Sequence, residues 1–264
     1  MSGATIARTA GITGRDWLGR GSAGVRLSPA GPGAGIWFNG SVRATVANAR
    51  TSGHDTCLGR GRSRVRMVEH LLAACYGLGV TDLAVETSGA TLPIGDGSAE
   101  PYVRLLRKAG IVRYEDGPAP ARLKRPVRVK EGARFIAAVP AKGLTINCLT
   151  RFPEFGPQFC SFALAPVSFG KGVAPARTLA LTDASPAALR QKLGLRFELK
   201  RAGRFVCAGR WRFRDEPCRH KALDLLGDIA LLGRPLEAKV FAYMPGHRLN
   251  HAFVRKVEKE LEAC

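Results

Sequence analysis

The sequence contains no long apolar run. No stretch of its 264 residues approaches the ~18 consecutive apolar residues that a membrane-spanning helix requires. The first residues, MSGATIARTAGITG, also lack the apolar core of a secretory signal. These two absences favour a protein of the cytoplasm.

Closely spaced cysteines are absent as well. The seven cysteines, at positions 57, 75, 148, 160, 207, 218 and 264, are scattered, and none forms a Cys-x-x-Cys pair. An odd count without short spacings argues against a disulfide framework. We expect reduced thiols, most of them small apolar residues of the core.

Acidic side chains are scarce. The chain has 41 Lys and Arg residues against 21 Asp and Glu residues, and its formal net charge is +20. Such an excess attracts polyanions, which include nucleic acid, anionic lipid head groups and diphosphate substrates. Aromatic residues make up only 7% of the chain, and neither an RNP-like aromatic pair nor a Gly-x-x-Gly clamp is present. Nucleic acid is therefore disfavoured, and a basic RNA-binding α+β protein is retained as an alternative.

The first part of the chain alternates short apolar runs with glycine-rich turns. This pattern predicts strands over 24–27, 35–38 and 82–86, and helices over 67–76 and 99–108. The segment Asp-Gly-Pro-Ala-Pro at 116–120 then interrupts every pattern, and it is the clearest linker in the sequence.

The second part opens with strands again. We expect strands over 126–130, 133–139 and 144–149, followed later by helices over 217–232 and 249–263. The prediction is an α+β fold of two similar domains, residues 1–119 and 120–264, each a small sheet layered against helices. No internal repeat is visible in the sequence itself.

Several of the five histidines have chemically suggestive neighbours. His70 directly follows Glu69, and His247 follows a Pro-Gly turn before a predicted helix. His220 and Asp224 are four residues apart, and Asp228 comes one helical turn later.

A histidine and a carboxylate on one helical face suit zinc or iron(II) better than a thiolate site would. Taken alone, each of these pairs is more often a solvated or capping pair. Together they form the inventory of a hydrolytic zinc site, which needs three protein ligands, a base and an acid.

Five motifs occur in a fixed order along the chain. They are VEHLLAACYGLG at 68–79, PIGDGSAEP at 93–101, ART at 176–178, RHKALDLLGD at 219–228 and PGHRLN at 245–250. With these motifs the sequence resembles the zinc-dependent UDP-3-O-acyl-N-acetylglucosamine deacetylases of lipid A biosynthesis.

The resemblance implies an active site between two similar α+β domains and a role for each matching residue. It implies that zinc is bound by His70, His220 and Asp224. Glu69 matches the family's general base and His247 its general acid, which Asp228 orients. Lys221 and Thr178 match positions that contact the substrate, a UDP-linked acylated amino sugar.

The chain departs from the family pattern where the family builds its acyl-chain passage. The segment between Thr178 and His220 is short and reads KLGLRFELKRAGRFVCAG in its central part. The sequence therefore leaves the acyl-chain length open, and a zinc amidase acting on another acylated amino sugar is a further alternative. The charge excess predicts peripheral contact with the anionic inner-membrane face. The sequence leaves the oligomeric state open, with a monomer favoured.

Overall fold

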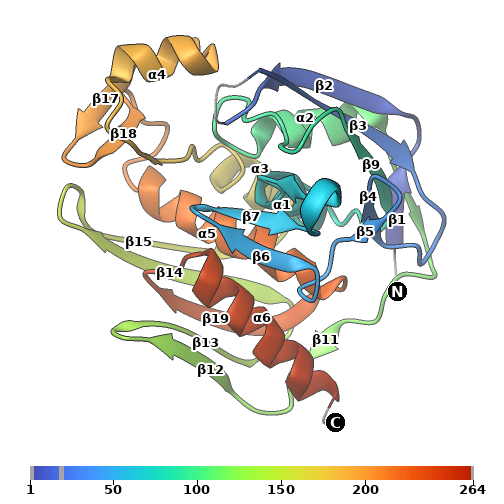
Figure 1. Ribbon diagram of the computed structural model, residues 1–264. Coiled ribbons are helices and arrows are strands. Elements are labelled where there is room, and N and C mark those ends of the chain that lie inside the picture. The colour runs from blue at the N-terminus through green and yellow to red at the C-terminus, as the bar shows by residue number, and fades with distance from the viewer. Residues whose placement is uncertain (1–2, 18–20, 263–264) are drawn as a thin grey trace.

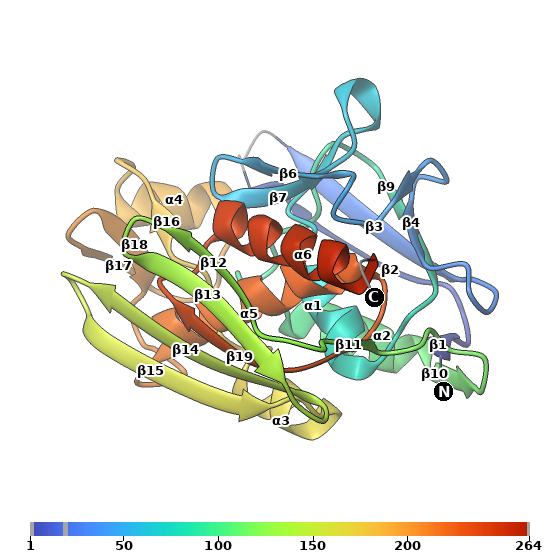
Figure 2. The same cartoon turned by 90° about the horizontal axis from the view of Figure 1, so that it is seen from below.

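Two β-sheets form the outer layers of the protein, and four helices lie between them. The computed structural model describes residues 3–17 and 21–262. Seen from below, α6, α5, α1 and α2 separate the sheet that contains β12 to β15 from the sheet that contains β2 and β3 (Figure 2). Each sheet therefore buries one face against the helical layer.

The N-terminal sheet has five strands in the order β2-β3-β9-β4-β5 (Figure 1). β9 pairs antiparallel with β3 and parallel with β4. The elements of this half are β2 (Ala10–Arg15), β3 (Ser22–Pro29), β4 (Ile36–Phe38), β5 (Val42–Arg43), α1 (Glu69–Leu78), β9 (Leu83–Thr87) and α2 (Glu100–Ala109).

The C-terminal sheet repeats this topology in the order β12-β13-β19-β14-β15. β19 pairs antiparallel with β13 and parallel with β14, as β9 does with β3 and β4. The elements of this half are β11 (Ala121–Arg122), β12 (Val127–Glu131), β13 (Arg134–Pro140), β14 (Leu144–Phe152), β15 (Gly156–Ala163), α5 (Glu216–Ile229), β19 (Leu236–Tyr243) and α6 (His247–Glu262). In both halves a helix precedes the central strand, and a second helix follows it.

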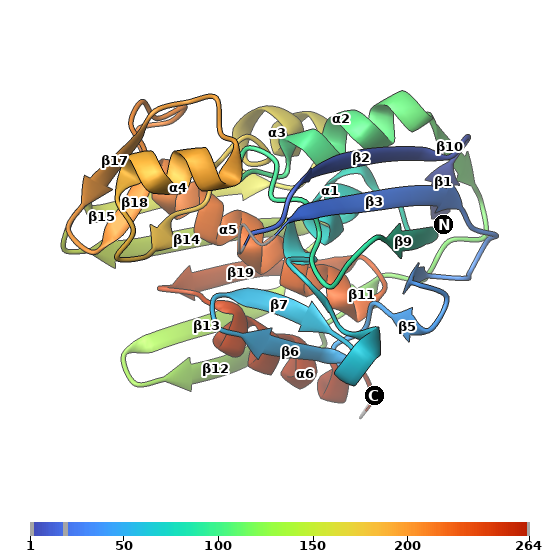
Figure 3. The same ribbon diagram turned by 45° about the horizontal axis from the view of Figure 1, so that its top comes forward.

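Each half carries an insertion before its first central helix, as Figure 3 shows. In the N-terminal half this is a three-stranded sheet of β6 (Ala49–Ser52), β7 (Asp55–Leu58) and β8 (Val65–Arg66). The C-terminal insertion comprises α3 (Pro166–Gly172), β16 (Ala180–Leu181), α4 (Pro186–Leu193), β17 (Leu199–Ala202) and β18 (Phe205–Ala208). A short ribbon of β1 (Gly3–Ile6) and β10 (Ile111–Tyr114) closes the N-terminal half.

The residue pattern explains these layers. β14 alternates inward residues such as Ile146 and Cys148 with outward ones such as Leu149, as a strand with one covered face requires. α1 is instead buried at nine of its ten residues, because helices lie on either side of it. It ends at Gly79, whose φ of 74° is the left-handed conformation that glycine adopts without strain.

The expected α+β class is confirmed, and each predicted strand and helix overlaps an observed one. The predicted helix over 67–76 instead runs from Glu69 to Leu78, because Met67 has a φ of 61° that no helix allows. The predicted end of the last helix at residue 263 lies outside the described residues. The domain division between residues 119 and 120 stays a prediction. Among the described helices, none is both long and apolar enough to span a membrane.

Gly227 sets the distance between α1 and α5, and a larger residue at this position should therefore lower the free energy of unfolding. A Cβ atom there would lie 2.2 Å from the backbone oxygen of Glu69. We expect Gly227→Ala to destabilise the protein by roughly 1–3 kcal/mol despite the better helix propensity of alanine, because overpacking outweighs it. Urea unfolding measures this change.

Gly172→Ala is the matched control, since its Cβ would meet only Arg219 Nη1 at 3.5 Å. Its free energy of unfolding should change by less than ~0.5 kcal/mol. Equal stability of Gly227→Ala and the unmodified protein would contradict the close helix contact.

Candidate metal centre and active site

The predicted site residues gather at one open cavity between the two halves. The cavity has a volume of about 470 Å³. Seven of the eight predicted residues line it, and they are Glu69, His70, Thr178, His220, Lys221, Asp224 and His247. The eighth, Asp228, is fully buried behind His247. The start of α1, one face of α5 and the start of α6 supply all of them except Thr178.

His70, His220 and Asp224 form a cluster of buried donor atoms. One nitrogen or oxygen from each residue lies within 4.8 Å of those of the other two. His220 Nε2 is 3.2 Å and His70 Nε2 is 3.8 Å from Asp224 Oδ1. His70 comes from α1 and the other two from α5, so the cluster joins the two halves.

The protonation of these residues fits a metal ligand set. Burial and the adjacent His220 lower the pKa of His70 to about 3, so this imidazole is neutral. His220 Nδ1 donates to the Ala176 carbonyl at 3.0 Å, which turns Nε2 toward Asp224 in the cluster. Two imidazole nitrogens and one carboxylate are a donor set that zinc accepts in catalytic sites.

Asp224 is held as an anion. Burial alone would raise its pKa, but His220 and Lys221 hold the pKa of this carboxyl well below its usual range. Lys221 Nζ donates to Asp224 Oδ2 at 2.8 Å. Burial would lower the pKa of Lys221, but the Asp224 charge raises it, and the lysine stays cationic.

Glu69 lies beside this cluster without an ammonium or guanidinium partner among the contacts of the described residues. Its Oε2 accepts a hydrogen bond from the Thr56 backbone N–H at 3.1 Å, and its Oε1 is 4.0 Å from His247 Nε2. Burial raises the pKa of Glu69 to about 8, although the neighbouring His247 opposes the shift. A carboxyl group with such a pKa can accept and release a proton near neutral pH.

His247 and Asp228 form a buried ion pair. His247 Nδ1 donates to Asp228 Oδ2 at 2.8 Å, and His247 Nε2 faces Glu69 and Asp224 at 4.0 Å each. Burial alone would lower the pKa of His247, but Asp228 reverses this effect and raises it to about 10. The imidazolium can therefore donate a proton from Nε2 into the cavity.

Three further residues contact Asp228, and the sequence had not indicated a role for any of them. Asn250 Nδ2 donates to Asp228 Oδ2 at 2.8 Å, and the Thr56 hydroxyl donates to Oδ1 at 2.6 Å. His251 Nε2 lies 3.2 Å from the same Oδ1. His251 follows His247 by one helical turn, and this spacing could have indicated a role for His251. A threonine in a hairpin gives no comparable indication.

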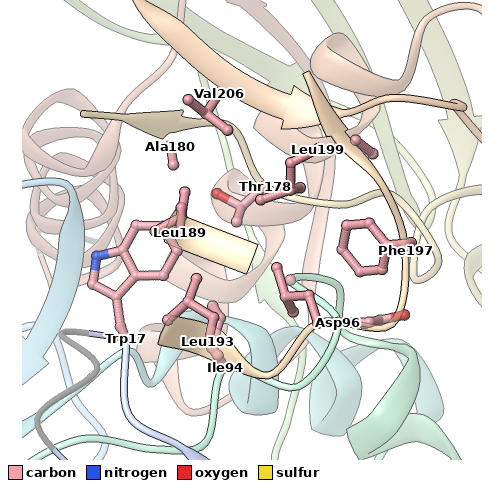
Figure 4. Close-up of a pocket in the computed structure, with 13 residues that line it drawn as sticks. Trp17, Ile94, Asp96, Thr178, Ala180, Leu189, Leu193, Phe197, Leu199 and Val206 are labelled. Atoms are coloured by element: carbon pink, nitrogen blue, oxygen red, sulfur yellow. The ribbon is translucent and has the colours of Figure 1, made fainter. Parts of the chain in front are cut away.

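Thr178 lies where the cavity meets a smaller apolar chamber. The chamber has a free volume of about 30 Å³ and is lined mainly by the C-terminal insertion, with Trp17, Ile94 and Asp96 from the other half (Figure 4). Thr178 N donates to the Gly97 carbonyl at 2.8 Å. The preceding Arg177 forms a buried ion pair with Glu216, with Nε and Oε1 2.7 Å apart.

The chain matches known proteins along most of its length. The family model for UDP-3-O-acyl N-acetylglycosamine deacetylase matches residues 3–259. A UDP-3-O-acyl-N-acetylglucosamine deacetylase of Chlamydia pneumoniae is 37% identical over 261 residues, which cover 93% of this chain and 92% of the relative. The enzyme of the same name from Chlamydia felis is 35% identical over 91% of both chains. That from Thermosynechococcus vestitus is 39% identical over 74% of this chain and 70% of its own.

The resemblance inferred from the five sequence motifs is thus confirmed along nearly the whole chain. Because the family model and these relatives span both sheets and all the elements that carry the buried cluster, the chain belongs to the UDP-3-O-acyl-N-acetylglucosamine deacetylase family.

Proposed function

We propose that the protein is a zinc-dependent deacetylase that hydrolyses the N-acetyl amide of a UDP-3-O-acyl-N-acetylglucosamine. The products are acetate and a free 2-amine on the acylated sugar. One observation supports this reaction most directly. A base with a raised pKa, Glu69, and a cationic acid, His247, face one cavity beside a three-ligand cluster.

The zinc ligands in this proposal are His70, His220 and Asp224. When bound, zinc supplies a Lewis acid that polarises the acetyl carbonyl and makes the attacking water more acidic. With two imidazoles and a single carboxylate as ligands, the centre would keep a net positive charge.

Glu69 acts as the general base. It accepts a proton from the water whose oxygen bonds to the acetyl carbon, and the Thr56 N–H holds Oε2 in place during this step. His247 then donates its Nε2 proton to the amide nitrogen as the C–N bond breaks. Asp228 keeps the imidazole protonated beforehand and fixes the direction of Nε2.

Lys221 and Thr178 contact the substrate. Lys221 stays cationic at the cavity wall, and we assign it to the sugar-nucleotide. Thr178 lies close to the reacting amide, at the entrance of the apolar chamber that receives the acyl chain.

The size of the chamber bears on which substrate is used, and another acylated amino sugar is the second candidate. Side chains such as Leu189 and Leu193 line the chamber, and its free volume of only about 30 Å³ favours a short acyl group. Mass spectrometry of the products from UDP-sugars with different acyl chains, and from other acylated amino sugars, distinguishes these substrates. Release of acetate from none of them would overturn the proposed function.

We further propose that the protein works in the cytoplasm at the membrane face, and that the outer face of the C-terminal sheet makes the contact. Four exposed apolar side chains lie on this face, and they are Val139, Leu149, Phe159 and Phe241. Leu149 pairs with both Phe159 and Tyr243 in the strand register, so apolar side chains form a row across three strands.

Cations lie beside two aromatic rings of this face. The Arg128 guanidinium lies 5.2 Å from the centre of the Phe135 ring, and Lys239 Nζ lies 5.9 Å from that of Phe241. Aromatic side chains interleaved with Lys and Arg are typical of contact with anionic lipid head groups. A second copy of this chain would instead bring like charges together across the interface.

The proposed ligands determine how much zinc each variant should bind. His70→Ala, His220→Ala and Asp224→Ala should each lower the zinc content of the purified protein, as measured by elemental analysis. Glu69→Ala should retain zinc and lose roughly 10²–10⁴-fold in activity, because it removes a base and not a ligand. His54→Ala, an exposed histidine of the same cavity, is the control and should retain zinc. A folded, unmodified protein that binds no zinc would refute the ligand assignment.

The pairing of His247 with Asp228 predicts how the reaction rate depends on pH. The negative charge of Asp228 raises the pKa of His247 to about 10, so Asp228→Asn should lower that pKa. His247 would then lose its proton at lower pH, and the alkaline limb of the rate profile should move to lower pH with a reduced maximum. Asp116→Asn, an exposed and distant charge change, should leave the limb in place. An unmoved limb in Asp228→Asn would contradict the pairing of acid and carboxylate.

The proposed contact face predicts which lipid vesicles the protein binds. The protein should pellet with phosphatidylglycerol vesicles at low salt, less at high salt, and not with phosphatidylcholine vesicles. The double variant Phe159→Asp/Phe241→Asp should lose most of this binding, whereas Val112→Asp, on the exposed strand β10, should keep it. Equal pelleting of both variants would assign the binding to another surface. RNA retention at ~200 mM salt would instead favour nucleic acid as the partner.

A further inference from the structure

Among the described residues, Thr56 alone donates hydrogen bonds both to the proposed base, Glu69, and to Asp228, the partner of the proposed acid. Its backbone N–H donates to Glu69 Oε2 at 3.1 Å, and its side-chain hydroxyl donates to Asp228 Oδ1 at 2.6 Å. Thr56 is itself completely buried, on β7 of the N-terminal insertion. It therefore reaches α1 and α5 at once, from outside both helices.

The direction of the hydroxyl hydrogen follows from its neighbours. Thr56 Oγ1 lies within 3.1 Å of three groups, which are Asp228 Oδ1, His247 Nδ1 and His251 Nε2. A hydroxyl has one hydrogen to donate, and an ionised carboxylate can only accept. The hydroxyl therefore donates to Asp228, and this contact is also the shortest of the three.

The same reasoning fixes the tautomer of His251. Because the Thr56 hydrogen points at Asp228, the oxygen can only accept from His251, at 3.0 Å. His251 must then carry its proton on Nε2, which also lies 3.2 Å from Asp228 Oδ1. His251 thereby prevents the hydroxyl from rotating toward another acceptor.

Asp228 is consequently surrounded by donors on both oxygens. Oδ2 accepts from His247 Nδ1 and Asn250 Nδ2, at 2.8 Å each, and Oδ1 accepts from Thr56 and lies beside His251. A fully buried carboxylate with its lone pairs occupied has one orientation. The orientation of His247 depends on that carboxylate.

We propose that Thr56, oriented by His251, is a positioning residue that fixes the base and the acid of the deacetylase relative to each other. The backbone N–H fixes Glu69 on one side, and the hydroxyl fixes the Asp228–His247 pair on the other. Neither group touches the substrate. This inference rests on the proposed function, since it concerns the alignment of the two groups that transfer protons.

The test compares Thr56→Val with Thr56→Ser in the zinc-loaded enzyme. Valine has nearly the shape of threonine and keeps the backbone N–H, but it removes the hydroxyl. We expect kcat to fall roughly 10- to 100-fold with KM and zinc content unchanged, because one hydrogen bond to a charged group is lost. Thr56→Ser should recover most of the lost kcat.

Thr150→Val is the matched control. Thr150 is also a fully buried strand threonine, but its hydroxyl has no hydrogen-bond partner among the described residues. Its kcat should remain that of the unmodified enzyme. If Thr56→Val does not fold, His251→Phe tests the same chain of hydrogen bonds, and kcat should again fall without a change in KM.

The outcomes separate this inference from the proposed function. An active unmodified enzyme with equal kcat in Thr56→Val and Thr150→Val would overturn the positioning role alone. A loss in Thr56→Val that serine does not recover would mean a merely structural role and would also overturn it. An unmodified, zinc-loaded protein without deacetylase activity would overturn the proposed function itself.

Discussion

The close contact of α1 with α5 determines the geometry of the whole site. Gly227 lets the backbone of α1 approach α5 at Glu69, where any larger side chain would overlap the Glu69 carbonyl. His70 follows Glu69 in α1, and Asp224 precedes Gly227 by one turn of α5. The proposed metal ligands of the two halves therefore meet because the helices meet at a glycine. A small change in this spacing would separate the ligand atoms before it disturbed either sheet.

Three carboxylates in one buried region have different protonation because their partners differ. Asp224 and Asp228 each contact a cation, Lys221 and His247 respectively, and stay ionised. Glu69 has only a backbone N–H and a histidine 4.0 Å away, so burial prevails and its pKa rises. Environments that separate the pKa values of neighbouring groups are what acid–base chemistry requires. Such buried environments also lower the free energy of unfolding, because a buried charge without its partner is strongly destabilising.

Local periodicity in the sequence predicted one part of the candidate site, and the resemblance to the family implied its other predicted residues. His220 and Asp224 are spaced by one helical turn, so their common face follows from helical geometry alone. Thr56 lies in a hairpin, and its contact with Asp228 exists only in the folded chain, because Asp228 lies on α5, 172 residues away in sequence. Likewise, the short strands β16 to β18 were not predicted, because two to four residues show no clear alternation. Tertiary contacts and not propensity place these segments.

The repeated topology explains why the remaining site residues come from the two insertions. In each half the insertion enters after the edge strand, β5 or β15, and leads into the first central helix, α1 or α5. The starts of these helices carry His70 and His220, so each insertion necessarily ends beside the ligand cluster. One insertion supplies Thr56 from β7, and the other supplies Thr178 and the apolar chamber. The Arg177–Glu216 ion pair ties the second insertion to the first residue of α5. In the proposed function, the insertion can therefore change in shape and alter substrate specificity while that ion pair and α5 keep the proposed ligands in place.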